Sequence, residues 1–558
     1  MPSSDPLAIV APRAPRSRAR AERHGRHRAL SLALTGAAIA LAAAACASDP
    51  ADGLEFAGPA DGSLLGIAEA EEAVLAVAAE DETALERVRL QHDGEELDAE
   101  RDGARLQVPV EAFDDGEHLV RAVAVPEDAD DEEPEELHEW RFALDTVPPE
   151  IELSEPEGAV VEGEPLRVAG TTEAGAEVHV GDERLEAGED GAFATEFDQP
   201  PGNPLEIVAV DAAGNRADTD VSLVTVPSRV EVEHVRGVHV TAHAWASDTF
   251  RERIIGMIDD GLINTVALTL KDESGHVGWD SDVELAEASG ANRGVYDLEE
   301  VVAELHDLGV HIAGRIVAFR DGTLGQHALD SGNEDLLIQT TDGDYYTSGG
   351  YGCCFTSFAH PDVIDYNIDL AEEAAAAGVD AILWDYIRRP DGDPEAMVVS
   401  GLDDDAGGTT LEEAVVEFAA QADERLRPYG IEHGASLYGI AADRPTQIAQ
   451  DVPAMSDHVD YVAPMIYPSH WGPGEYGVDD PNRQPYDIIT ATLDVWKEQV
   501  EGTRSRIVPW LEDTNYRAWD RPEQVREQIR AARDQDIHEF IMWDPNVDYT
   551  VEAYDPDQ

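Results

Sequence analysis

The chain of 558 residues is poor in positive charge: 38 Lys and Arg stand against 118 Asp and Glu, and lysine occurs at Lys271 and Lys497 alone. A formal net charge of −80 repels the phosphates of nucleic acid and the anionic face of a membrane. These two classes of partner are therefore excluded. We interpret the acidity as a solvated surface suited to high salt, where repulsion between charges is screened over a short distance.

Cysteine is also scarce, with Cys46, Cys353 and Cys354 as the full set. Zinc sites and disulfide frameworks need several thiols at spacings such as Cys-x-x-Cys, which this sequence lacks. We expect the adjacent Cys353 and Cys354 to be a buried pair of free thiols, with a disulfide between neighbours as the alternative. No glycine-rich phosphate loop follows an apolar strand segment, so nucleotide chemistry has no support.

Long apolar runs are missing apart from one near the start, Ala29–Ala45, which follows the arginine-rich residues 11–28. This order is that of an export signal. The run is short for a membrane span of ~20 residues and ends in small residues directly before Cys46. The ending resembles a bacterial lipoprotein signal, which predicts loss of residues 1–45, lipidation of Cys46 and a place at the cell surface. Plain secretion and an uncleaved anchor are the alternatives.

Two all-β domains are predicted next, over residues 46–147 and 148–228. Short apolar runs alternate with polar residues and are separated by Gly and Asp turns, as in Ala73–Val77 and Leu205–Val210. Such runs indicate the strands of a β sandwich. The start Asp145–Pro149 and the turn Asp211–Asn215 resemble bacterial immunoglobulin-like repeats of surface proteins. Neither domain has a catalytic cluster, so we interpret both as spacers.

From residue 229 to 558 the pattern changes to strands that alternate with amphipathic helices. Eight apolar strands are predicted, at residues 237–241, 265–270, 310–318, 379–385, 434–439, 461–466, 506–511 and 539–543. Eight such strands over about 330 residues predict a (β/α)₈ TIM barrel, in which the polar groups at the carboxyl ends of the strands meet at one mouth.

The residues at these strand ends are rich in carboxylates and aromatic rings. Aromatic faces stack on sugar rings, and paired carboxylates cleave glycosidic bonds by acid and nucleophile or base chemistry. The predicted catalytic residues are Asp385, Asp513, Asp272 and Glu273, and the predicted substrate-binding residues are Lys271, Arg315, Tyr386, Arg388, Tyr438, Tyr467, His470, Trp510 and Trp543. No metal site is expected, since His239 and His243 have no spacing that fixes both on one ion.

Several segments in order resemble a bacterial family of uncharacterised glycoside hydrolases, whose TIM barrel is distantly like that of α-amylase. The segments are Arg236–Thr241, Leu270–Gly275, Ala313–Phe319, Trp384–Pro390, Ala463–Trp471 and Val508–Asp513, and the likeness spans about Val235 to Tyr549. The resemblance implies hydrolysis of a polysaccharide without a cofactor.

Under this resemblance, Asp385 occupies the strand-four place of a nucleophile, and we expect Arg388 to keep it ionised. The family often has an acid on strand five, where this chain has Ser436. Asp272, Glu273 or Asp513 must then supply the acid, with Asp513 favoured over Glu512 by the family match. The alternative function is a non-catalytic glycan-binding or envelope scaffold protein. A metal-dependent hydrolase would need His243 or His470 beside Asp272 and Asp385.

Overall fold

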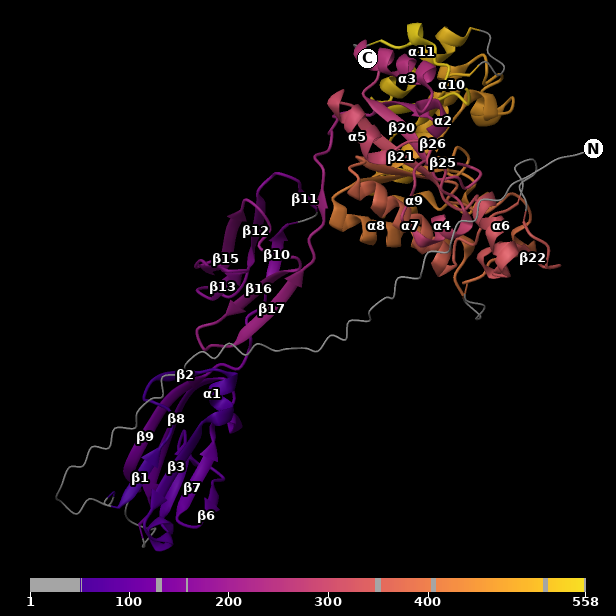
Figure 1. Cartoon of the computed structure of the whole chain (residues 1–558). Helices are drawn as coiled ribbons and strands as arrows, with labels where there is room; N and C mark the ends of the chain where they lie inside the picture. Colours follow the sequence, from indigo (N-terminus) through magenta and orange to yellow (C-terminus); the bar gives the residue numbers. More distant parts are fainter. Residues whose placement is uncertain are drawn as a thin grey trace, which may run out of the picture.

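The structure is a computed structural model that describes residues 51, 53–126, 133–156, 159–346, 353–402, 408–514 and 520–555. The predicted signal at residues 1–45 and the predicted lipidation site Cys46 lie outside these residues. Along the chain, two β-rich domains precede a larger α/β domain (Figure 1). In the part described, no helix has the length and apolar character needed to cross a membrane.

The first β-rich domain consists of two sheets, with strand orders β1-β3-β7-β6 and β2-β9-β8-β4-β5. Their inward-facing residues form one core that includes Val120, Trp140 and Phe142. In β9, buried residues alternate with more exposed ones over Trp140–Leu144, as the sequence pattern predicts. The elements are β1 (Leu54–Ala57), β2 (Ser63–Leu65), α1 (Ile67–Glu72), β3 (Val74–Ala79), β4 (Val88–His92), β5 (Glu95–Glu96), β6 (Glu100–Asp102), β7 (Arg105–Pro109), β8 (Gly116–Ala124) and β9 (Glu135–Leu144).

The second β-rich domain has sheets ordered β10-β12-β15 and β14-β13-β16-β17, and a short parallel pair, β11-β18. Val168, Val178 and Ile207 are fully buried in its core. The strands are β10 (Glu152–Glu155), β11 (Val160–Val161), β12 (Leu166–Thr171), β13 (Glu177–Val180), β14 (Glu183–Glu186), β15 (Ala192–Phe197), β16 (Leu205–Val210), β17 (Arg216–Val221) and β18 (Thr225–Val226).

Asn215, in the turn after β16, joins the two β-rich domains. Its Oδ1 accepts a hydrogen bond from the Ile67 backbone N–H (2.7 Å), and its Nδ2 donates to the Asp145 carbonyl (2.8 Å) and to Asp211 Oδ2 (2.8 Å). Asn215 is buried, its bond to Asp211 is buried with it, and its bonds to Ile67 and Asp145 are partly buried. The turn that resembles a repeat signature in the sequence therefore serves as the contact between domains.

We expect Asn215→Ala to weaken this junction by about 1–3 kcal/mol, because the Ile67 amide loses its acceptor. Limited proteolysis should then cleave the segment 145–151 faster. Asn203→Ala is the matched control, since Asn203 makes two comparable bonds to Leu223 inside the second domain. Equal cleavage rates in the two variants would contradict the role of Asn215.

The C-terminal domain is an eight-stranded parallel barrel, which confirms the predicted fold class for this region. The closed order is β19, β20, β21, β23, β25, β26, β27/β28 and β29, and β29 pairs with β19. The strands are β19 (Arg236–Val240), β20 (Thr265–Lys271), β21 (His311–Val317), β23 (Ala381–Asp385), β25 (Glu432–Tyr438), β26 (Tyr461–Met465), β27 (Arg506–Ile507), β28 (Trp510–Glu512) and β29 (Phe540–Trp543). The seventh strand is split at Pro509, which has no N–H to donate.

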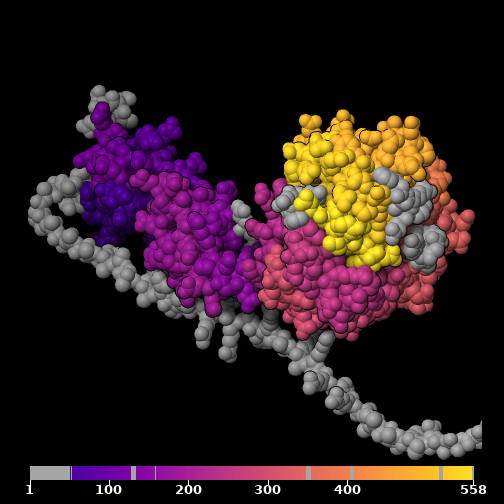
Figure 2. All heavy atoms as spheres, turned by 90° about the horizontal axis from the view of Figure 1, so that it is seen from above, coloured from indigo at the N-terminus to yellow at the C-terminus, as the bar shows by residue number. Residues whose placement is uncertain are grey.

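Helices surround this barrel, and in the space-filling view it forms the larger lobe beside the β-rich domains (Figure 2). They are α2 (Ala242–Trp245), α3 (Asp248–Asp259), α4 (Glu284–Ser289), α5 (Leu298–Asp307), α6 (Gly322–Ser331), α7 (Pro361–Ala376), α8 (Leu411–Leu426), α9 (Val452–Ser456), α10 (Pro485–Val500) and α11 (Arg521–Asp534). Local sequence fixes several starts: Thr410 and Glu413 form a capping box at α8, and Asp297 caps α5. A short pair, β22 (Gln339–Thr340) and β24 (Met397–Val398), joins the loops after β21 and β23.

The barrel interior combines small and large side chains. Ala267, Ala313 and Ala381 leave space that Tyr461 and Trp510 fill from the opposite wall. The outward-facing residues of the strands pack against the helices in a second, larger core. At the amino end of the barrel, Arg229 donates hydrogen bonds to the carbonyls of Ala375, Val379, Tyr429 and Gly430, and so ties the entering segment to the barrel base. The carboxyl end is left for the candidate site.

Candidate active site

A cavity of about 450 Å³ opens at the carboxyl ends of the barrel strands. Its lining comes from seven strands or from the loops directly after them, namely β20, β21, β23, β25, β26, β28 and β29, as the barrel rule predicts. Nine residues predicted from the sequence are among them: Glu273, Arg315, Asp385, Tyr386, Tyr438, Tyr467, His470, Trp510 and Trp543. Gly439, Ile440, Met465 and Trp471 complete the lining. Of these, Trp471 is the aromatic residue missing from the predicted binding set, although it directly follows His470.

Arg315 joins the two carboxylates of the cavity. Its Nε and Nη2 lie 2.8 and 2.6 Å from Asp385 Oδ2, and the same Nη2 lies 2.6 Å from Glu273 Oε1. The two carboxylate oxygens are therefore no further apart than twice 2.6 Å. The register between the strands explains why Arg315 reaches Asp385. Val317 of β21 pairs with Asp385 of β23, and Arg315 lies two residues before Val317 on the same face of the sheet.

The charge of Arg315 dominates the titration of its neighbours. Burial would raise the pKa of Glu273, but the charge and hydrogen bond of Arg315 outweigh it and lower this pKa to about 2. His239 lies deeper in the barrel, where burial first and the charge of Arg315 second lower its pKa to about 3. At neutral pH, Glu273 is therefore a carboxylate and His239 is an uncharged ring that contacts Thr269 Oγ1 at 2.8 Å.

The expected partner of Asp385, Arg388, lies elsewhere, and this interpretation is corrected. Tyr386 has a left-handed backbone (φ 53°), which turns the chain sharply after Asp385. Arg388 then donates to the Arg389 carbonyl and lies over the rings of Phe355, Tyr386 and Tyr438 at 5.2–5.7 Å. It supports two aromatic residues of the cavity and is not itself part of the lining.

The aromatic wall is built from residues of β28 and β29 and from the loop after β26. Tyr467 stacks on Trp543 with ring centroids 5.1 Å apart and an interplanar angle of 23°, and His470 meets Tyr467 edge-on. Trp510 donates its indole N–H to Ser436 Oγ (2.9 Å), so the strand-five residue that replaces the expected acid is buried as an acceptor. The cavity thus combines two close carboxylates with flat apolar faces.

Residues 237–549 match a family model described as a "putative glycosyl hydrolase domain". The chain belongs to this family. The resemblance drawn from the sequence segments is thereby confirmed, and the match covers the whole barrel from β19 to β29. No curated protein matches the chain.

Solved structures similar to this chain include three from bacteria. A hypothetical protein from Ruminiclostridium thermocellum is 27% identical, with 36% of this chain and 96% of that chain covered and a TM-score of 0.31. The PgaB (BpsB) glycoside hydrolase domain from Bordetella bronchiseptica is 15% identical over 56% and 95%, with a TM-score of 0.41. The α-galactosidase TtGalA from Thermus thermophilus is 13% identical over 70% and 72%, with a TM-score of 0.36. These values are too low to transfer a substrate or mechanism.

Two predicted residues of the glycosyl hydrolase domain lie outside the cavity because of a bulge at the end of β20. The pairing of β20 with β21 shifts register between Thr269 and Lys271, so the inward and outward alternation is interrupted there. Lys271 is fully buried, with Nζ 2.7 Å from Asp321 Oδ2. Asp272 closes a local turn by accepting from the amides of Ser274 and His276. Glu273 is the residue of this segment that reaches the cavity.

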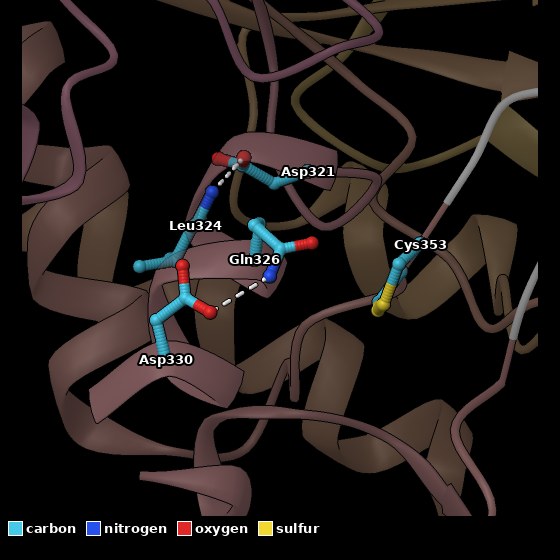
Figure 3. The surroundings of a disulfide bond; sticks show 6 residues. Asp321, Leu324, Gln326, Asp330 and Cys353 are labelled. Carbon is cyan, nitrogen blue, oxygen red and sulfur yellow. Dashed lines mark hydrogen bonds between the residues drawn. A yellow bond between two sulfur atoms is a disulfide. The ribbon is translucent and has the colours of Figure 1, made fainter. Parts of the chain in front are cut away.

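Asp321 also caps α6, beside the cysteine pair (Figure 3). Its backbone N–H donates to the Cys354 carbonyl (3.2 Å). Cys353 and Cys354 form a disulfide, so the expectation of free thiols is wrong and its alternative holds. The buried Lys271–Asp321 pair fastens the start of α6 to β20, and the Asp321–Cys354 backbone bond ties the cysteine segment of the long loop after β21 to the same point.

Asp513, the favoured acid partner, is also absent from the lining. Its carboxylate receives hydrogen bonds from Arg521, Thr550 and Tyr554, and its side chain is fully buried. Within the described residues, no group of three His, Cys, Asp or Glu side chains is arranged to hold a metal ion. The carboxylates that the structure brings together in the cavity are therefore Asp385 and Glu273.

Glu512, which the family match ranks below Asp513, faces the barrel interior. Burial raises the pKa of Glu512 to about 7, although hydrogen bonds from Ser469 and Thr514 oppose the shift. The signal in the sequence is the alternation of β28: Trp510 and Glu512 point inward, and Leu511 packs outward against the helices.

The raised pKa of Glu512 predicts a pH-dependent stability. The folded state binds the proton more tightly than the unfolded state, whose value is 4.5, so stability is lost as pH rises from 4.5 through about 7. Glu512→Gln cannot titrate. Between pH 5 and pH 8 the wild type should therefore lose about 2–3 kcal/mol relative to this variant. Urea unfolding at both pH values tests this, and parallel pH profiles would contradict it.

Proposed function

We propose that this protein is an exported glycoside hydrolase that cleaves a polysaccharide at the barrel mouth, with Asp385 as the nucleophile. The observation that carries the proposal is the Asp385–Arg315–Glu273 group inside an aromatic cavity. Retaining glycosidases have two carboxyl groups about 5–5.5 Å apart, and the upper limit set by the two bonds to Arg315 is compatible with that class.

The aromatic wall supports a saccharide ligand. The stacked pair Tyr467–Trp543 and the neighbouring Trp510 and Trp471 offer flat apolar faces, while the carboxylates and Arg315 offer acceptors and donors for hydroxyl groups. A sugar ring has the same combination of C–H faces and hydroxyl edges. Asp385 attacks the anomeric carbon as Glu273 gives its proton to the leaving glycosidic oxygen, and water, which returns a proton to Glu273, then releases the glycosyl group from Asp385.

One observation favours a second candidate, a non-catalytic glycan-binding protein. With a pKa of about 2, Glu273 carries no proton at neutral pH and cannot protonate the leaving oxygen while Arg315 holds it. Under the hydrolase proposal, a bound saccharide moves Arg315 away from Glu273. The pKa of Glu273 then rises, and its carboxyl group takes up a proton. Under the binding proposal, the ion pair persists and the glycan is held intact.

A panel of polysaccharides incubated with the full chain separates the two candidates. The panel includes α-glucans, β-glucans, chitin-type glycans and the envelope glycans of the cell, with reducing ends and binding measured together. Release of reducing ends with retention of anomeric configuration in the first product, followed by NMR, supports the retaining hydrolase. Binding without release from any member supports the glycan-binding protein, and neither binding nor release would contradict both.

We further propose that the two β-rich domains are immunoglobulin-like spacers and that lipidated Cys46 anchors the chain at the cell surface. The two-sheet construction of both domains and the buried contact at Asn215 support a spacer role. Mass spectrometry of the mature N terminus tests the anchor: a diacylglyceryl group on Cys46 is expected, and an unmodified or uncleaved N terminus would overturn it.

A further inference from the structure

Glu512 contacts a loop that forms part of the cavity wall. The segment Tyr467–Trp471 after β26, here called the aromatic loop, presents Tyr467, His470 and Trp471 to the cavity. Ser469, in the middle of this loop, points the other way and is buried. Its backbone N–H donates to Glu512 Oε1 and its hydroxyl to Oε2, both at 2.6 Å. Both oxygens of the carboxyl group therefore hold one residue of the loop.

Among the described residues, the other hydrogen bonds of the 3₁₀ turn in the aromatic loop are local to the loop. Within it, the 3₁₀ turn Pro468–His470 has no side-chain cap, and the His470 N–H bonds back to the Tyr467 carbonyl at 3.0 Å. Pro468 has no N–H to contribute. The bonds from Ser469 to Glu512 join residues 43 positions apart in the sequence and cross from β26 to β28. They are short hydrogen bonds to a group that carries charge when ionised, which is the stronger class.

Glu512 is itself held in place. Its backbone N–H donates to Gln528 Oε1 (3.0 Å) and its carbonyl accepts from Gln528 Nε2 (2.8 Å), and Gln528 is buried in α11. A continuous set of contacts therefore runs from α11 through β28 to the aromatic loop. Because Tyr467 stacks on Trp543, a shift of the aromatic loop also shifts the ring contact that Trp543 of β29 makes in the cavity.

We propose that Glu512 is a positioning residue that sets the affinity of the cavity for saccharide by holding the aromatic loop through Ser469. This inference rests on the proposed carbohydrate site. Glu512 does not line the cavity, so it acts through the loop and not on the reacting atoms. Loss of the carboxyl group should loosen the rings that bind the sugar and leave the Asp385–Arg315–Glu273 group in place.

The test compares four variants in the full chain. Glu512→Ala removes both bonds and Ser469→Ala removes the hydroxyl bond, whereas Glu512→Gln keeps an acceptor for the amide and a donor for the hydroxyl oxygen. Glu539→Ala is the matched control, because Glu539 is a buried carboxylate of the same barrel that bonds to Arg506 and Val235 far along the chain from the loop.

Hydrogen exchange of the peptide that covers residues 466–471 is the readout that needs no saccharide. In Glu512→Ala the Ser469 amide should exchange at least about tenfold faster, since it loses a bond to a charged acceptor. Glu512→Gln and Glu539→Ala should leave this rate within about threefold of wild type. Unchanged exchange in Glu512→Ala overturns the proposal.

The second readout uses the glycan that the panel identifies, or chitohexaose, maltoheptaose and cellohexaose as binding probes. KM or Kd should rise about tenfold or more in Glu512→Ala, kcat should stay within about threefold, and Glu512→Gln should restore the affinity. A fall in kcat at constant KM, or no rescue by Gln, overturns the positioning role. Faster exchange without binding of any glycan by the wild type contradicts the proposed function and leaves the loop contact established.

Discussion

Asp385→Asn should lower the rate of glycan hydrolysis by about 10³-fold or more, because an amide oxygen does not form the glycosyl ester that a retaining mechanism requires. The Asn side chain nearly preserves the size of Asp, and its single carbonyl oxygen can still accept either from Arg315, which bonds to Asp385 Oδ2, or from the Tyr386 amide, which bonds to Oδ1 at 2.7 Å. Saccharide binding should therefore persist. Reducing-end release and binding, measured on the same glycan, check both expectations.

Asp380→Asn is the matched control for this prediction. Asp380 is a buried carboxylate at the opposite end of the same strand, where it accepts from the amides of Val230 and Ile312. Its substitution should lower stability and leave the activity of the folded protein within about twofold.

In Asp385→Ala, azide should restore turnover by attacking the anomeric carbon from the vacated side, and the product is then a glycosyl azide of inverted configuration. Equal activity of wild type and Asp385→Asn would remove Asp385 from the mechanism.

Arg315→Met should destabilise the barrel by about 3–5 kcal/mol, because it leaves a buried carboxylate without its counter-charge. The side chains of Arg315 and Asp385 are exposed by 7% and 6%, so solvent screens this pair little. The pKa of Glu273, which Arg315 lowers to about 2, should rise at the same time. Tryptophan fluorescence during urea unfolding reports on the barrel, since Trp140 is the one tryptophan of the two β-rich domains.

Two comparisons make the Arg315 prediction specific. Arg388→Met should cost about 1–2 kcal/mol, since Arg388 contributes contacts with aromatic rings and no bond to Asp385. The double variant Arg315→Met with Asp385→Asn should be more stable than Arg315→Met alone, because the unpaired charge is gone. A larger loss for Arg388→Met than for Arg315→Met would restore the original interpretation that Arg388 is the partner of Asp385.

The alternation of apolar residues was sufficient to predict the eight barrel strands and the end of the barrel that carries the cavity. Asp385 and Glu273 could be placed there because each follows a buried strand, and parallel strands in a barrel end at one face. The aromatic residues Tyr467, Trp510 and Trp543 followed from the same rule. These predictions depend on local periodicity and on chain order, which a sequence contains.

The sequence did not reveal whether a side chain at the end of a strand faces the cavity or the outside of the barrel. Lys271 turns out of the barrel because of the bulge in β20, and Asp513 bonds to Arg521 while its neighbour Glu512 faces inward. One residue of shift reverses the face of a side chain, so small irregularities decide which group reaches a cavity. The pair Cys353–Cys354 likewise required the spatial arrangement to distinguish a disulfide from free thiols.

The sequence by itself determined the barrel, the β-rich region before it and the acidic and aromatic character of the mouth, since these depend on patterns repeated over many residues. The tertiary structure alone decided that Arg315, and not Arg388, joins Asp385 to Glu273. The physical reason is that this contact depends on the register between β21 and β23 and on the left-handed turn at Tyr386. Neither the register nor the turn produces a periodic pattern in the amino-acid sequence.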